Sequence, residues 1–98
     1  MYMKIHENGK NRVIAVCDSE LIGRILEDKN IYMDLETHKG FYVGNKVKKQ
    51  DVEKALERYT SINFVGKQAV GIVISKGLVD IESIMYINDI PYIQIYKI

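Results

Sequence analysis

The sequence is poor in the residues on which several classes of protein depend. It has one cysteine among 98 residues, which excludes an internal disulfide and any CxxC metal or redox motif. Its net charge is only +1, so the overall charge selects no class of partner. No apolar run approaches the roughly 18 residues that a membrane-spanning helix needs. Lys4, His6 and Glu7 interrupt the start where a signal peptide would be apolar, so we expect a cytoplasmic protein without a membrane partner.

The residues that are present favour a single globular domain over residues 1–98. Hydrophobic residues make up 47% of the chain, which is typical of a folded rather than a disordered protein. A chain of this length buries roughly 60–70% of its unfolded surface and needs no metal or disulfide to hold its core together. We predict an α+β fold in which antiparallel hairpins at both ends pack on two or three helices.

The longest nearly unbroken apolar run covers residues 63–78. A helix that is apolar on almost every side is buried on almost every side, so we predict a central buried helix over residues 63–77. Asn63 is a suitable N-cap for this helix, and Gly77 lies where a left-handed glycine commonly ends one. Gly66 has two interpretations: it allows close packing of a neighbouring element, or it leaves backbone N–H groups open to a bound anion.

The first residues of the chain predict a β-hairpin. Residues 1–7 and 12–17 flank an Asn-Gly turn signal, and a tight turn at that Asn-Gly pair is one alternative. A register that pairs Ile5 with Ile14 matches the hydrophobic residues better. The second strand is apolar on both faces, so we expect it to be central in its sheet.

Between the two ends, the hydrophobic pattern changes from segment to segment. The expected elements are a short helix that starts at residues 18–20 with Asp18 or Ser19 as its cap and is ended by residues 28–30, a strand over 31–35, a short strand over 41–43 and an amphipathic helix over 51–59. The last of these has its apolar residues at the i, i+3, i+4 and i+7 spacing of a half-buried helix.

The last residues predict a second hairpin, with strands over residues 84–87 and 90–97 joined by a two-residue Asn-Asp turn. Tyr92, Gln94 and Tyr96 then share one face and form a polar, aromatic stripe. Half-buried tyrosines are common on a sheet face. The alternative is a protein-binding face, because tyrosine is enriched in interfaces.

Charge is distributed unevenly along the middle of the chain. Residues 18–36 carry six acids and two bases, whereas residues 37–50 carry four lysines and no acid. Lysines bind RNA phosphates and aromatic rings stack on unpaired bases, so we predict RNA contacts in the basic stretch. A binding face would have to exclude the acidic stretch, and the alternative is a solvated loop with Phe41 anchored in the core. The predicted contact residues are Lys39, Phe41, Tyr42, Lys46, Lys48 and Lys49.

Cys17 is the only thiol and therefore the first candidate nucleophile. It ends an apolar strand, where a free cysteine usually behaves as a small hydrophobe, so we expect it to be buried and unreactive. His6, Cys17, Asp34 and His38 match no metal-ligand spacing. The chain also lacks phosphate-loop, dinucleotide and nucleophile-elbow motifs. The sequence therefore favours a non-enzymatic protein with no catalytic residues, no metal and no cofactor.

Several stretches, taken together, resemble a small archaeal family known as domain-of-unknown-function family 424. The matching residues follow the chain in order and include Cys17, Asp18, Glu20, Leu21, Gly23, Phe41, Tyr42, Gly44, Asn63, Val65, Gly66, Ala69, Val70, Gly77, Leu78, Val79, Pro91 and Gln94. Tyr92 stands where the family commonly has a His, and Val43 where it commonly has a second Gly. The resemblance implies an archaeal cytoplasmic α+β protein in the setting of translation and ribosome biogenesis, and it implies no catalytic residues.

The sequence therefore leaves three hypotheses for function. The leading one is a non-enzymatic RNA- or ribosome-associated binding protein in translation. The second is a protein-interaction adaptor or a homodimer that uses the face of Tyr92, Gln94 and Tyr96. The third is an enzyme that uses Cys17, or a small-molecule site at Gly66.

Overall fold

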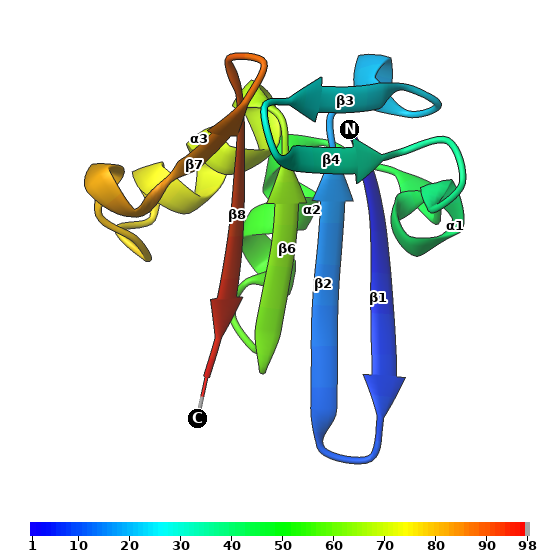
Figure 1. The fold of residues 1–98 in the computed structure, drawn as a ribbon. Helices are drawn as coiled ribbons and strands as arrows, with labels where there is room; N and C mark the ends of the chain where they lie inside the picture. The colour runs from blue at the N-terminus through cyan, green and yellow to red at the C-terminus, as the bar shows by residue number, and fades with distance from the viewer. Residues whose placement is uncertain (98) are drawn as a thin grey trace.

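A mixed six-stranded sheet runs through the molecule in the computed structural model, which describes residues 1–97 (Figure 1). Strands β2 and β6 run parallel, whereas the other neighbouring strands pair antiparallel. In spatial order the strands are β5 (Asn45–Lys46), β1 (Tyr2–Asn8), β2 (Asn11–Cys17), β6 (Ser61–Val65), β8 (Ile90–Tyr96) and β7 (Met85–Ile87).

Different elements cover the two faces of this sheet. Two helices, α2 (Lys49–Ala55) and α3 (Lys67–Ser75), lie behind it in the view of Figure 1. A small hairpin of β3 (Ile25–Asp28) and β4 (Ile31–Asp34) crosses in front of the upper end of the sheet. The one-turn helix α1 (Lys39–Tyr42) follows this hairpin on the same side. Antiparallel hairpins packed with helices in this way confirm the predicted α+β fold.

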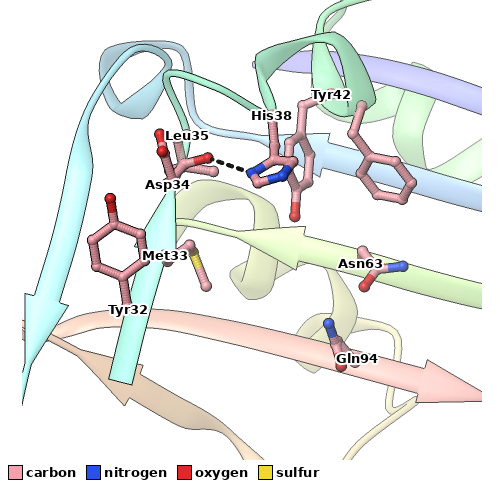
Figure 2. A pocket seen from close by; sticks show the side chains of 9 residues that line it. Tyr32, Met33, Asp34, Leu35, His38, Tyr42, Asn63 and Gln94 are labelled. Atoms are coloured by element: carbon pink, nitrogen blue, oxygen red, sulfur yellow. Dashed lines mark hydrogen bonds between the residues drawn. The ribbon is translucent and has the colours of Figure 1, made fainter. Parts of the chain in front are cut away.

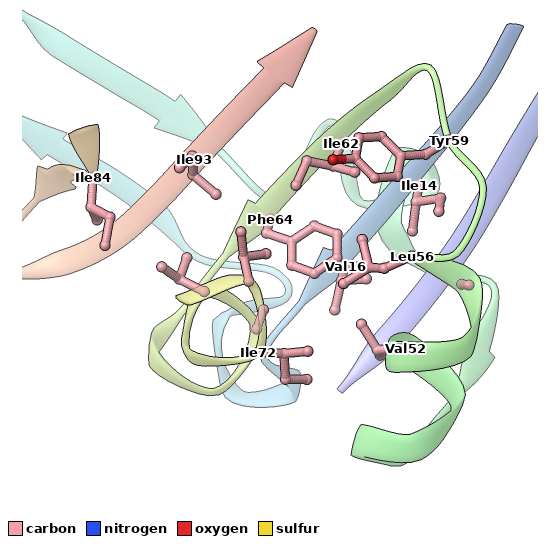
Figure 3. Packing of buried hydrophobic residues seen from close by; sticks show 14 residues of the cluster. Ile14, Val16, Val52, Leu56, Tyr59, Ile62, Phe64, Ile72, Ile84 and Ile93 are labelled. Carbon is pink, nitrogen blue, oxygen red and sulfur yellow. The ribbon is translucent and has the colours of Figure 1, made fainter. Parts of the chain in front are cut away.

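The central strands are buried on both faces because helices cover one side and the small hairpin the other. Along β2, Ile14 and Val16 pack into the cluster beneath the helices, while Cys17 packs beneath the hairpin. All three are 0% exposed, and so is Ala15 between them, which confirms that this strand is central. Phe64 of β6 lies in the middle of the helix-side cluster, close to Val16 (Figure 3).

The predicted central helix is correct in its second half and wrong at its start. Residues 61–65 form strand β6, so Asn63 lies in a strand and caps no helix, and α3 begins at Lys67. A short apolar run suits a fully buried strand as well as a helix, and here β2 supplies a parallel partner for it. Gly66, whose φ is +111°, makes the sharp turn between the two elements. None of the helices within residues 1–97 has the length and apolar character to cross a membrane.

The helix expected to start at residues 18–20 and to end at residues 28–30 is replaced by a strand in its second half. Only the 3-10 turn η1 (Ser19–Leu21) is helical, and the chain then turns at Gly23, whose φ is +88°. The Gly23 N–H donates to the Leu35 carbonyl at 3.1 Å. This hydrogen bond joins the two ends of the β3–β4 hairpin, so residues 25–26 become the start of a strand.

The expected strand over residues 41–43 is a helical turn instead. In α1 the Val43 N–H donates to the Lys39 carbonyl at 2.8 Å. Successive side chains of a strand point to opposite faces, whereas neighbours on a helix are about 100° apart. The helical turn therefore lets both rings face the same side of the sheet. Phe41 stacks on His6, and Tyr42 packs against the core beneath the hairpin.

The other expected elements are confirmed, although the helix expected over residues 51–59 begins at Lys49 and already ends at Ala55. The first hairpin pairs Ile5 with Ile14, and its turn needs Gly9 at a φ of +61°. The last hairpin pairs Ile87 with Ile90 across Asn88 and Asp89, both of which have the positive φ angles of a type I′ turn. It is preceded by a second 3-10 turn, η2 (Ile81–Ser83).

A buried carboxylate, that of Asp18, fixes the start of α3. Asp18 follows β2, is 1% exposed, and donates its own N–H to the Val65 carbonyl at 3.0 Å. Its two carboxylate oxygens accept the N–H groups of Gln68 at 3.0 Å and Ala69 at 2.9 Å. A Cβ on Gly66 would lie 2.3 Å from the Asp18 carboxylate carbon. The anion interpretation of Gly66 is therefore wrong, because the chain fills this helix N-terminus with its own carboxylate.

Replacing Asp18 with Ala should lower the free energy of unfolding by about 2–3 kcal/mol, because two backbone N–H groups at a buried helix start lose a charged acceptor. The midpoint of a urea unfolding curve measures this loss. Asp51→Ala is the matched control, since Asp51 is exposed and its carboxylate accepts a single backbone N–H, that of Lys48, at the start of α2. Equal losses for the two variants would contradict the structural role of Asp18.

Candidate functional site

The sheet face opposite α2 and α3 is covered at one end and open at the other. At the covered end, Leu26 and Leu35 of the hairpin region pack on Cys17 and Val65 of the sheet. Beyond this contact, polar side chains replace apolar ones on the same face. Among them, Asn63 of β6 and Gln94 of β8 are directly opposite each other in the antiparallel pairing, so their side chains lie next to each other at the edge of the hairpin.

A pocket of about 520 Å³ lies between this polar floor, the β4 strand and α1 (Figure 2). Its walls carry four rings and its floor two amides. These side chains are Tyr32, His38, Phe41, Tyr42, Asn63 and Gln94. An adjoining hollow of about 450 Å³ shares three of them, Phe41, Asn63 and Gln94, and extends along the open face to Tyr96. The two hollows therefore form one groove across the open face of the sheet.

The floor of the pocket offers polar side chains that have no hydrogen-bond partner among the described residues. Within residues 1–97 no hydrogen bond involves the side-chain amide of Asn63 or of Gln94, and none involves the Tyr42 hydroxyl. Burial raises the pKa of that hydroxyl to about 12, with a smaller contribution from Cys17. The hydroxyl therefore remains protonated at neutral pH and can donate. Figure 2 shows it directed from the wall toward Asn63.

Two residues of β1 hold the aromatic wall in place. The Lys4 ammonium donates to the Gly40 carbonyl at 2.9 Å, and His6 Nε2 lies 2.8 Å from the Phe41 carbonyl. Because a carbonyl only accepts, Nε2 carries the hydrogen of that bond. The His6 and Phe41 rings are stacked with centroids 4.5 Å apart, and Phe41 meets Tyr42 edge to face at 5.1 Å. A four-residue helix thus gains a fixed position from the strand beneath it.

The one carboxylate in the pocket lining, that of Asp34, is engaged in its own loop. It accepts the N–H groups of Thr37 at 2.8 Å and Glu36 at 3.0 Å, and these hydrogen bonds lower its pKa, that from Thr37 most. His38 Nδ1 lies 3.2 Å from the Asp34 carbonyl (Figure 2). Among the described residues the pocket lining includes no Lys or Arg, so the pocket presents rings, amides and this one carboxylate, and no Lys or Arg cation.

The structure separates the lysines that the sequence grouped with Phe41 and Tyr42. Lys39 belongs to α1, and Lys46 of β5 is paired with Tyr2, so its side chain is on the open face. Its ammonium lies 6.0 Å from the Tyr2 ring centroid. Lys48 and Lys49 instead begin α2 on the opposite face, where Lys49 lines a hollow beside α3. The aromatic residues therefore share a face with two of the four predicted lysines.

The polar stripe on β8 joins the same groove rather than forming a separate face. Gln94 lines both hollows, and Tyr96 is 77% exposed at the far end. Tyr92 is half-buried and packs beneath the hairpin. The sequence does not identify Asn63 as a site residue, because Asn63 fits the N-cap of the predicted central helix. The signal that would have found it is the alternation Ser61, Asn63 on one face of an otherwise apolar strand.

The remaining candidates from the sequence do not form a reactive site. Cys17 is 0% exposed, which confirms the expected burial, and burial together with the Asp18 and Glu20 carboxylates raises the pKa of its thiol to about 12. His6 and His38 each hydrogen-bond a backbone carbonyl. In the part of the chain that the structure describes, no three His, Cys, Asp or Glu side chains gather as metal ligands would.

Comparison with known proteins decides the family. Residues 5–98 match the model of a family described as "Protein of unknown function (DUF424)". The chain belongs to this family. It is also similar to a solved structure, "Crystal structure of an uncharacterized conserved protein from Methanopyrus kandleri", with 26% sequence identity and a TM-score of 0.79 over 97% of this chain and 89% of that one. No curated protein matches the chain.

The buried thiol should be unreactive in the folded protein. A thiol reagent added at about pH 8, well below the pKa of about 12 for Cys17, meets neither an accessible sulfur nor a thiolate. We expect reaction at the rate of global unfolding, and complete titration of one thiol per chain in denaturant. Stoichiometric reaction of the folded protein within seconds would show that Cys17 is accessible.

Proposed function

We propose that this protein binds single-stranded RNA in the groove on the open sheet face and catalyses no reaction. The observation that carries the proposal is the pair of unpartnered amides, Asn63 and Gln94, on a floor between aromatic walls. Single-stranded RNA is recognised by stacking of unpaired bases on rings and by hydrogen bonds to base edges. The groove offers both kinds of contact within one surface.

The acidic stretch forms part of the groove, and this determines how RNA would lie. We predicted from the sequence that a binding face must exclude that stretch, yet Asp34 of β4 is in the pocket lining. A phosphate would be repelled there and would find no cation to pair with. The pocket therefore suits the uncharged part of a nucleotide, the base, and the phosphates must lie outside it.

In this proposal Lys39 and Lys46 meet those phosphates. Both are exposed, and neither forms an ion pair within residues 1–97. They belong to α1 and β5, the elements next to the aromatic wall. In this proposal the aromatic wall holds bases while the two lysines anchor the backbone beside it. The expected cytoplasmic setting among archaeal translation proteins, with ribosomal RNA as a partner, remains part of the proposal.

Binding to single-stranded RNA should depend on salt in proportion to two phosphate contacts. The slope of log affinity against log salt should be about −1.4 for two contacts, against about −3 for the four lysines proposed from sequence. Fluorescence anisotropy with a labelled oligonucleotide across a salt series measures this slope. The double variant Lys39→Ala/Lys46→Ala should bind more weakly and with a slope near zero.

The matched control is Lys48→Ala/Lys49→Ala, which removes the same charge from the opposite face. It should keep the wild-type affinity and slope. An equal loss for the two double variants would show that net charge, and not this face, governs binding. Absence of binding by the wild-type protein at low salt would overturn the proposed function.

A protein partner or a second copy of the chain is the alternative, favoured by the exposure of Tyr96 at the end of the groove. Tyr96→Ala should then abolish a discrete complex that survives moderate salt, as judged by sedimentation velocity. Tyr92→Ala is a poorer test because Tyr92 packs beneath the hairpin, so its loss would also destabilise the fold. A monomer with no captured partner would remove this alternative.

A further inference from the structure

We infer that the pocket between β4 and α1 selects adenine among the bases of single-stranded RNA. This inference rests on the proposed function and deepens it, because it names which base the groove holds. It follows from three properties of the pocket: a lining whose one ionised side chain is an engaged carboxylate, the type of hydrogen-bonding groups on its floor, and the size of the aromatic surface in its walls.

The lining excludes charged ligands. It has no Lys or Arg to pair with a phosphate. Its one carboxylate, on Asp34, is already bound by the N–H groups of Thr37 and Glu36, so an ammonium group would compete with these contacts. The volume of about 520 Å³ is within the roughly 300–1,000 Å³ typical of small-molecule sites. A neutral heteroaromatic ring is the ligand that fits this chemistry.

The floor matches the edge of adenine. A side-chain amide presents one acceptor and a donor side by side, and adenine presents its N6 amino group beside a ring nitrogen, so the two pair through two hydrogen bonds. Asn63 and Gln94 each offer this pair of groups, and the protonated Tyr42 hydroxyl adds a donor for a ring nitrogen. Guanine presents two acceptors, O6 and N7, on the corresponding edge, so the donor and acceptor of an amide match only half of it. The one carboxylate in the lining that could accept from its N1–H and N2 amino groups, that of Asp34, is already bound by the N–H groups of Thr37 and Glu36.

The walls favour a purine over a pyrimidine. Uracil also presents a donor beside an acceptor, so hydrogen bonds alone would not reject it. Stacking on aromatic side chains depends on ring area, and a purine covers more of the surface formed by Tyr32, Phe41 and Tyr42 than a single pyrimidine ring does. Stacking and edge complementarity therefore both favour adenine.

The test compares the binding of short oligoadenylate, oligouridylate and oligocytidylate by the full chain at one salt concentration, with AMP, GMP and adenosine as competitors. Oligoadenylate should bind at least about tenfold more tightly than the two pyrimidine oligomers, and adenosine and AMP should compete better than GMP. Gln94→Ala should reduce this preference to about twofold or less without unfolding the protein, because Gln94 is exposed. Gln68→Ala, an exposed amide on α3 behind the sheet, is the matched control and should keep the preference.

Each outcome separates the inference from the function on which it rests. Equal binding of the three oligomers, or an unchanged preference in Gln94→Ala, would overturn adenine selection and leave RNA binding intact. Absence of binding by every oligomer would overturn the proposed function. A third outcome is that AMP binds as tightly as oligoadenylate and independently of salt. This outcome would support the adenine pocket but show that its ligand is a free nucleotide. It would therefore overturn the RNA proposal.

Discussion

The contact between the Asp18 carboxylate and the first turn of α3 is the constraint on which the remaining structure depends. It joins the end of β2 to the start of a helix that begins 49 positions later in the chain, at Lys67. Gly66 makes the contact sterically possible, since any Cβ there would collide with the carboxylate. Because β2 and β6 run parallel and end together, this one carboxylate sets the position of the helix, both central strands and the core between them.

The candidate site is a consequence of how the two faces of the sheet are divided. On the helix side, large apolar residues such as Phe64 form a continuous buried cluster beneath α2 and α3. On the other side, a hairpin and a single helical turn cover only part of the strands, and Asn63 and Gln94 occupy the uncovered floor. An amide on a buried face would lose hydrogen bonds to water. Polar side chains are therefore tolerated where the cover ends, and the same residues give the groove its chemistry.

Much of this architecture can be predicted from hydrophobic pattern and turn chemistry. Both hairpin registers, the central position of β2 and the burial of Cys17 follow from the order of the residues alone. The strand at residues 61–65 cannot be predicted in this way. When a run is apolar on both faces, the alternation of apolar and polar residues that distinguishes a strand from a helix is lost. The groove cannot be predicted from the order of residues either, because it is formed by β4, α1, β6 and β8, which are distant in sequence and meet only in the fold. Lys46 and Lys49 are three positions apart in sequence yet belong to opposite faces.

The order of strands also limits how this molecule can associate. The two outermost strands, β5 and β7, comprise only two and three residues. A growing β-sheet between chains needs an edge whose N–H and C=O groups can pair. β5 covers only Tyr2 and Met3 of β1, and β7 covers only residues 90–92 of β8, so residues 4–8 and 93–96 keep one edge that pairs with no strand within residues 1–97. The exposed tyrosines of the open face therefore lie between two short unpaired edge segments, and a second chain can associate through side chains on that face or through backbone pairing along either segment.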